Sequence, residues 1–202
     1  MAELKPKVML FGHSFVKRLS CRSERRGESV SQTLGLEAGC AMSSFGQGGL
    51  TFDKILLDPG RYIQCIVVGG QPDLLIVDVG SNDLGAVDTS VAKVVDNALR
   101  FLGMLDAHGI FPQRILFMSV IQRTAGGMHG RVPLTTYNHR VKAYNARLAT
   151  CLTQYPHIRT VSQTKINHQK FICRDGCHLT EEGLTKYGFG VRQSILNYLT
   201  SC

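Results

Sequence analysis

The chain has 202 residues, of which 44% are hydrophobic and 19% are charged, and its formal net charge is +8 at pH 7. This length fits one α/β domain with a substantial buried core, and the composition excludes the polar, highly charged class of disordered chains. No apolar run approaches the ~20 residues that cross a bilayer, and the first residues lack the apolar stretch of a signal peptide. We therefore expect a single domain over residues 1–202 that is cytoplasmic, by itself or within a longer intracellular protein.

The first part of the chain alternates strand-like and helix-like segments. A short apolar run predicts a strand over residues 8–11, and a helix begins near Phe15. A second strand is expected over residues 40–45, before a glycine-rich turn. A helix is expected over residues 52–57, and the Pro-Gly pair at 59–60 is expected to stop it.

The middle of the chain contains the most apolar segment. Residues 73–79 are nearly all apolar, as expected of a central parallel strand that is covered on both faces. Apolar residues then recur at helical spacing from Val91 to Leu105, and His108-Gly109 supplies a stop. Another buried strand is expected over residues 115–121.

The last part continues this alternation. Residues 137–152 carry apolar side chains on one helical face, and residues 158–162 predict the last strand. Thr180 is followed by two glutamates, a pattern typical of an N-cap with an acidic first turn, and the helix it opens extends to Leu199. Because right-handed crossovers join such alternating elements, we expect a parallel sheet between two layers of helices.

Four short segments rich in glycine and polar residues are expected at one edge of this sheet. Three of them follow predicted strands, at residues 12–14, 46–49 and 80–82. The fourth, at residues 175–178, precedes the last helix in a loop that can fold back over the same edge. In open parallel sheets the loops at the carboxyl ends of the strands surround the ligand crevice, so these segments are candidates for a site.

Together these segments contain the groups that acyl transfer from an ester requires. Ser14 lies at a helix start, where its hydroxyl is a nucleophile at the sheet edge and its own amide can bind an oxyanion. The spacing of Asp175 and His178 allows a turn to aim the carboxylate at one imidazole nitrogen while the other faces the serine. Gly49 and Asn82 can donate to the same oxyanion, from a backbone amide and a side-chain amide.

In their order along the chain, these segments resemble the motifs of the SGNH (GDSL-like) hydrolases, over nearly the whole length. The resemblance implies a three-layer α/β/α sandwich with a central, mainly five-stranded parallel sheet of flavodoxin-like type, and an enzyme without a metal or organic cofactor. It makes Ser14 the nucleophile, with Asp175 and His178 completing the catalytic triad. It assigns the oxyanion hole to the amide of Ser14, to Gly49 and to Asn82.

Within that family the chain is similar to the platelet-activating-factor acetylhydrolase-like esterases and to the esterase domain of LINE-type retrotransposon first-open-reading-frame proteins. The Gly-His-Ser-Phe motif around Ser14 favours the latter. The family usually has an aspartate before the nucleophile, where this chain has His13, so the support of the loop is expected to differ. We expect a serine esterase whose partner is a small ester or lipid substrate with a short acyl group, acetyl above all.

The basic residues leave a second function open. One cluster of positive side chains could release counterions on binding phosphates, so the alternative is a module that binds nucleic acid or an anionic membrane. The cluster lacks interleaved aromatic residues for base stacking, and a solvated surface is the simpler interpretation. The cluster consists of Lys17, Arg18, Arg22, Arg25 and Arg26.

Other roles for the histidines and cysteines are weaker hypotheses. His13 could be the base for Ser14, but adjacent side chains on a strand-to-helix turn usually diverge. A metal site at Cys173, Cys177 and His178 lacks the usual Cys-x-x-Cys spacing and a second ligand pair. The seven cysteines are odd in number and irregularly spaced, so we expect reduced thiols.

Overall fold

The computed structural model describes residues 5–26, 34–124, 132–163, 166 and 169–201, and of residues 22–26 it describes the backbone only. Within these residues a five-stranded parallel sheet has the strand order β2-β1-β3-β4-β5. The strands are β1 (Lys7–Gly12), β2 (Ala41–Gly46), β3 (Leu74–Asp78), β4 (Arg114–Met118) and β5 (Ile158–Val161). The helices are α1 (Ser14–Arg26), α3 (Phe52–Leu57), α4 (Pro59–Ile66), α5 (Ser81–Leu84), α6 (Val91–Ala107), α7 (Leu134–Leu152), the 3₁₀ helix η2 (Gln169–Phe171) and α8 (Glu181–Leu199).

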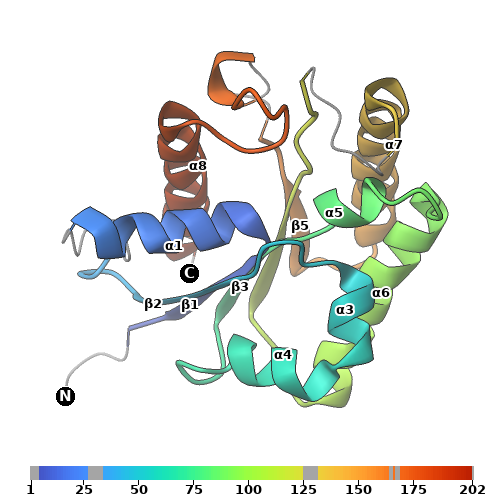
Figure 1. The fold of residues 1–202 in the computed structure, drawn as a ribbon. Helices are drawn as coiled ribbons and strands as arrows, with labels where there is room; N and C mark the ends of the chain where they lie inside the picture. Colours follow the sequence, from blue (N-terminus) through green and yellow to red (C-terminus); the bar gives the residue numbers. More distant parts are fainter. Residues whose placement is uncertain (1–4, 27–33, 125–131, 164–165, 167–168, 202) are drawn as a thin grey trace.

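Helices cover both faces of the sheet and produce three layers (Figure 1). On one face, Leu74 and Ile76 of β3 pack in a buried cluster with side chains of α1 and α8. On the other face, Leu75 and Val77 pack with side chains of α3, α4, α6 and α7. Successive residues of a strand point to opposite faces, so a strand covered on both sides is apolar nearly throughout. The predicted three-layer α/β/α sandwich with a five-stranded parallel sheet is confirmed.

The strand order changes direction between β1 and β3. Strand β1 pairs with β2 on one side and with β3 on the other, so the chain reverses its direction of travel across the sheet at β1. In sheets of this flavodoxin-like order, ligands bind outside the carboxyl ends of the strands at this reversal. Gly12 at the end of β1 pairs with Asp78 at the end of β3. The segments that contain Ser14 and Asn82 therefore leave the sheet as neighbours.

Helix α4 begins where the sequence predicted a stop. The preceding helix α3 covers residues 52–57 and ends before the Pro-Gly pair at 59–60, as predicted, but Pro59 then begins the unpredicted helix α4. Asp58 caps the new helix by accepting a hydrogen bond from the Arg61 N–H (3.4 Å). Proline is tolerated at this position because the first N–H groups of a helix have no partner within the helix.

Two further boundaries differ from the expected ones. Strand β4 ends at Met118 and not at residue 121, because the Val120 N–H donates to the side chain of Asn145 on α7 (2.9 Å) instead of to a strand. The segment after β3 winds into the short helix α5, which the sequence did not predict. Helix α8 begins as predicted, with Thr180 accepting the N–H of Gly183 (3.1 Å). This capping residue lies two residues after His178, and the helix begins at Glu181.

Candidate active site

Ser14 is the first residue of α1 and is separated from β1 by one residue. Glycines allow the backbones to meet closely around it. A Cβ on Gly12 would lie 2.6 Å from the carbonyl oxygen of Asp78, and a Cβ on Gly46 would lie 2.1 Å from the backbone nitrogen of Lys17. Neither position can hold a side chain without moving the backbone. Ser14 is half-buried, so its side chain lies at the rim of the sheet and not in the core.

Backbone hydrogen bonds join the loops that follow β1, β2 and β3. The Gln47 N–H donates to the carbonyl of Gly12 (3.0 Å), and the His13 N–H donates to the carbonyl of Asp78 (3.0 Å). The loop that carries the serine is therefore fixed from both sides. These bonds hold Ser14 in a fixed position relative to the ends of β2 and β3.

The two expected oxyanion-hole donors come from adjoining segments. Gly49 has φ +69°, in the left-handed region that favours glycine. Asn82 lies in α5, and its Nδ2 donates to the carbonyl of Leu50 (3.0 Å). The next residue, Asp83, accepts the N–H of Phe52 through Oδ1 (2.9 Å). The structure thus brings Asn82 next to Leu50, the residue after Gly49.

Asp175 and His178 form a hydrogen-bonded pair in residues 175–178, which we name the acid–base turn. Asp175 Oδ2 lies 2.6 Å from His178 Nδ1, and Oδ1 accepts the N–H groups of Cys177 and His178, both at 2.9 Å. Partial burial by itself raises the pKa of the Asp175 carboxyl, but these backbone bonds and the imidazole outweigh burial and lower the pKa from 3.8 to about 2. An ionised carboxylate at Nδ1 leaves Nε2 as the proton acceptor.

Leu179, the residue after the acid–base turn, contacts the helix that begins with Ser14. Arg18, one helical turn along α1, donates from Nη1 to the carbonyl of Leu179 (3.5 Å), which directly follows the turn. The Thr124 N–H donates to the carbonyl of Gly176 within the turn (3.1 Å). Helix α1, the loop after β4 and the acid–base turn therefore meet at the carboxyl edge of the sheet.

His13 makes a contact that the sequence did not predict. Its ring was expected to diverge from Ser14, but Nδ1 lies 3.5 Å from Ser14 Oγ. Nδ1 also accepts the N–H of Phe15 (3.4 Å), and Nε2 lies 3.3 Å from Asp78 Oδ1, so the bonding pattern assigns the ring proton to Nε2. Within the described part of the chain, the Ser14 hydroxyl contacts His13, and no hydrogen bond joins it to the acid–base turn.

Below the serine, His13 belongs to a buried polar network. Asp78 Oδ2 accepts the hydroxyl of Tyr187 on α8 (2.7 Å), and Oδ1 faces the imidazole. His13, Asp78 and Tyr187 are each at most 3% exposed. Burial and the neighbouring Asp78 raise the pKa of Tyr187 well above its usual value, so the hydroxyl keeps its proton and remains a donor. The network joins the residue that follows β1 to β3 and α8, next to Ser14.

No metal centre is formed by the described residues. None of them belongs to a group of three or more His, Cys, Asp or Glu side chains that could hold an ion. Cys173 Sγ donates to the carbonyl of Leu179 (3.3 Å). Cys173 and Cys177 are both free thiols.

The predicted basic cluster is only partly described. Lys17 and Arg18 are exposed on α1. The side chains of Arg22, Arg25 and Arg26 lie outside the described part of the structure, so a contact with a polyanion stays a prediction. Among the described helices, none combines the length and the apolar character that crossing a membrane requires.

Comparison with solved structures identifies proteins of the same fold. A GDSL-like lipase from Bacteroides thetaiotaomicron has a TM-score of 0.70 at 18% identity, over 95% of this chain and 88% of its own. A lipase/acylhydrolase from Enterococcus faecalis has a TM-score of 0.63 at 17% identity, over 94% and 95%. A candidate SGNH hydrolase from Slackia heliotrinireducens has a TM-score of 0.65 at 12% identity, over 95% and 99%.

These similarities are structural and not close in sequence. No family model matches the sequence, and no curated protein matches it. Identities of 12–18% over nearly the full length establish a shared fold. The resemblance to SGNH and GDSL-like hydrolases that the sequence indicated is confirmed at the level of the fold.

Proposed function

We propose that this chain is a serine hydrolase of carboxylic esters, with Ser14 as the nucleophile. The observation that carries the proposal is the pair of Asp175 and His178, joined at 2.6 Å in a turn whose next residue, Leu179, accepts a hydrogen bond from the helix that begins with Ser14. A carboxylate, an imidazole and a hydroxyl at one sheet edge are the groups of an acyl-transfer triad. Solved structures of the same fold include a lipase and an acylhydrolase, which supports the ester class.

The reaction follows from the acid–base chemistry of these groups. Ser14 Oγ attacks the ester carbonyl carbon while His178 Nε2 accepts the hydroxyl proton, and Asp175 stabilises the imidazolium. The tetrahedral intermediate then expels the alcohol, which takes the proton from His178 and leaves an acyl group on Ser14. Water attacks the acyl-enzyme in the same way, transfers a proton to His178, and releases the carboxylic acid and the free serine.

The negative charge of each tetrahedral intermediate needs donors that are already in position. We assign this role to three donors: the amide of Ser14, the amide of Gly49 and the side-chain amide of Asn82. The hydrogen bond from Asn82 to Leu50 orients the side-chain amide of Asn82. Backbone hydrogen bonds between the loops that follow β1, β2 and β3 limit the reorganisation of the donors during the reaction. Loss of one such donor typically raises a barrier by about 3 kcal/mol.

His13 supports the nucleophile in the resting enzyme and is not the base in this proposal. Its Nδ1 accepts the Phe15 N–H at 3.4 Å and contacts the Ser14 hydroxyl only at 3.5 Å, a long distance for a hydrogen bond between these atoms. Rotation of the Ser14 side chain toward His178 replaces this contact in the reactive state. The short Ser14 loop at an open sheet edge favours small acyl groups, acetyl above all.

Hydrolysis of p-nitrophenyl acetate tests the assignment. We expect the wild type to turn the ester over and Ser14→Ala to lose about 10³-fold or more in kcat/KM. Ser20→Ala is the matched control, because Ser20 lies on the same helix with its hydroxyl bonded to the carbonyl of Val16 (3.0 Å). Equal rates for the wild type and Ser14→Ala would reject the nucleophile.

A further inference from the structure

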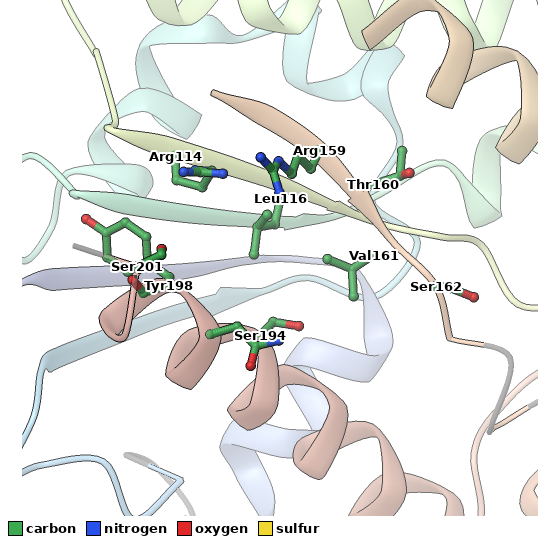
Figure 2. Close-up of a pocket in the computed structure, with 10 residues that line it drawn as sticks. Arg114, Leu116, Arg159, Thr160, Val161, Ser162, Ser194, Tyr198 and Ser201 are labelled. Carbon is green, nitrogen blue, oxygen red and sulfur yellow. Dashed lines mark hydrogen bonds between the residues drawn. The ribbon is translucent and has the colours of Figure 1, made fainter. Parts of the chain in front are cut away.

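A cavity lies away from the candidate active site, between the edge of the sheet and α8 (Figure 2). Its volume is about 440 Å³, which is within the range of small-molecule sites. Strands β4 and β5 form one wall, with Arg114 and Leu116 on β4 and Arg159 on β5. Helix α8 forms the other wall, with Asn197 and Tyr198. The cavity is therefore built from regular elements, which hold their side chains in fixed directions.

Two arginines project from the sheet into this cavity. Leu116 pairs with Arg159 across β4 and β5, so both side chains lie on the same face of the sheet. Arg114 is two residues before Leu116 and therefore also lies on that face. The Arg114 Nε is buried and has no hydrogen-bond partner. No carboxylate of the described residues lies within ion-pair distance of either guanidinium, and none lines the cavity.

Two neighbouring guanidinium groups without a carboxylate partner are unfavourable unless an anion binds between them. Like charges in one partly enclosed space repel each other, and a buried donor without a partner loses its hydration without compensation. A neighbouring carboxylate would reduce both the repulsion and the loss of hydration, but none of the described residues places a carboxylate in this cavity. A bound anion of double charge would relieve them as well.

We propose that this cavity binds a small phosphomonoester. A phosphomonoester carries nearly two negative charges at neutral pH, which matches Arg114 and Arg159, and its oxygens suit the bidentate fork of a guanidinium. The Asn197 amide supplies a neutral donor at the cavity wall. Leu116, 7% exposed, and the ring of Tyr198 offer apolar surface to the organic part of the ligand.

The cavity is separate from the proposed esterase site. Helix α8 starts beside the acid–base turn, whereas Asn197 and Tyr198 lie near its last residue, Leu199. The helical rise from Glu181 to Asn197 is about 24 Å. Arg114 is the first residue of β4, at the amino edge of the sheet, and Ser14 follows the carboxyl edge. A ligand here would act as a regulator or a second substrate and not as the ester.

Isothermal titration calorimetry of the full chain tests this site with inorganic phosphate and phenyl phosphate, and with acetate at equal ionic strength. We expect one phosphate per chain, tighter binding of phenyl phosphate because of the apolar wall, and no saturable binding of acetate. Arg114→Gln and Arg159→Gln should each weaken binding about tenfold to a hundredfold. Arg147→Gln is the matched control, because this exposed arginine lies on α7, on the opposite face of the sheet.

Three results would overturn the proposal. They are the absence of saturable phosphate binding to the wild type, phosphate binding that survives both cavity substitutions, and acetate or inorganic phosphate binding as tightly as phenyl phosphate. Arg159 is exposed, so Arg159→Gln tests the site even if Arg114→Gln disturbs the strand. Ester hydrolysis is expected to be unchanged in both variants without phosphate, which separates this test from that of the active site.

Discussion

The wild-type protein is expected to lose stability as the pH rises from 4 to 6, and replacing Asp83 by Asn is expected to abolish this loss. Asp83 follows the proposed oxyanion donor Asn82 and is 5% exposed. Its Oδ1 accepts the Phe52 N–H at 2.9 Å, but its Oδ2 is buried without a partner. Burial, which outweighs the backbone hydrogen bonds, raises the pKa of Asp83 from 3.8 to about 6.

The sign and size of the effect follow from proton binding. Between pH 4 and pH 6 the folded protein retains the Asp83 proton that the unfolded chain has lost, so stability falls as the pH rises through this range. The difference between 3.8 and about 6 corresponds to about 3 kcal/mol. Asn keeps an acceptor for the Phe52 N–H but does not ionise, so the variant should gain stability relative to the wild type as the pH rises.

Urea unfolding at pH steps from 4 to 8 measures this difference. Asp175 does not contribute to a change in stability between pH 4 and pH 8. Its lowered pKa stabilises the fold above pH 4, and this stabilisation is lost only as the pH falls toward about 2. Asp106→Asn, an exposed change on α6, is the control. If Asp83→Asn and the wild type lose stability in parallel from pH 4 to pH 6, the account of this buried carboxyl is refuted.

Three further substitutions test other parts of the site. Gly46→Ala is expected to destabilise the fold by about 3 kcal/mol or more, because a Cβ there would lie 2.1 Å from the backbone nitrogen of Lys17 on α1. Gly48→Ala is the control: a Cβ there has no atom within 4 Å, so stability should change by less than about 1 kcal/mol. Thermal or urea unfolding compares the two, and equal effects would contradict the close approach. Tyr187→Phe removes a 2.7 Å hydrogen bond to a buried carboxylate, so we expect a loss of about 1–3 kcal/mol in the free energy of unfolding; unchanged stability would argue against the network. Asp175→Asn should lower kcat about 10²- to 10⁴-fold at pH 7 while the fold persists, and full activity would remove this residue from the triad.

Elements whose signal is local were predictable from the sequence. Strand β3 is buried at all five positions, and its continuous apolar run marks a central parallel strand. Helix α6 begins at Val91 as expected, because Ser90 accepts the N–H of Lys93 (3.2 Å). The Asp175–His178 pair is also local, since three residues of one turn bring the carboxylate to the imidazole. In each case neighbours along the chain determine the structure.

Features that depend on distant residues were not predictable in this way. Asp78 and Tyr187 are 109 residues apart and meet only because α8 packs across β3. His13 reaches Asp78 because Gly12 is in register with it, and no local pattern specifies that register. Helix α4 was missed because Pro59 is compatible with both a helix stop and a helix start, and the capping side chain of Asp58 decides between them.

The two arginines of the cavity beside α8 are also a feature that depends on residues far apart in the sequence. Arg114 and Arg159 lie on separate strands, and nothing in their immediate sequence indicates a shared cavity. Their common face follows from the register of β4 and β5. The composition showed that the chain is basic, but the sequence predicted an anion contact at the basic residues of α1 and not at these two arginines.

Reaction with a fluorophosphonate probe, followed by mass spectrometry of the digested protein, tests the central claim most directly. The probe forms a stable bond only with a serine that a neighbouring base activates. We predict a single modification at Ser14 that is lost in His178→Ala and retained in Arg147→Gln. Modification of a different residue, or ester hydrolysis without any labelling of Ser14, would contradict the proposed nucleophile.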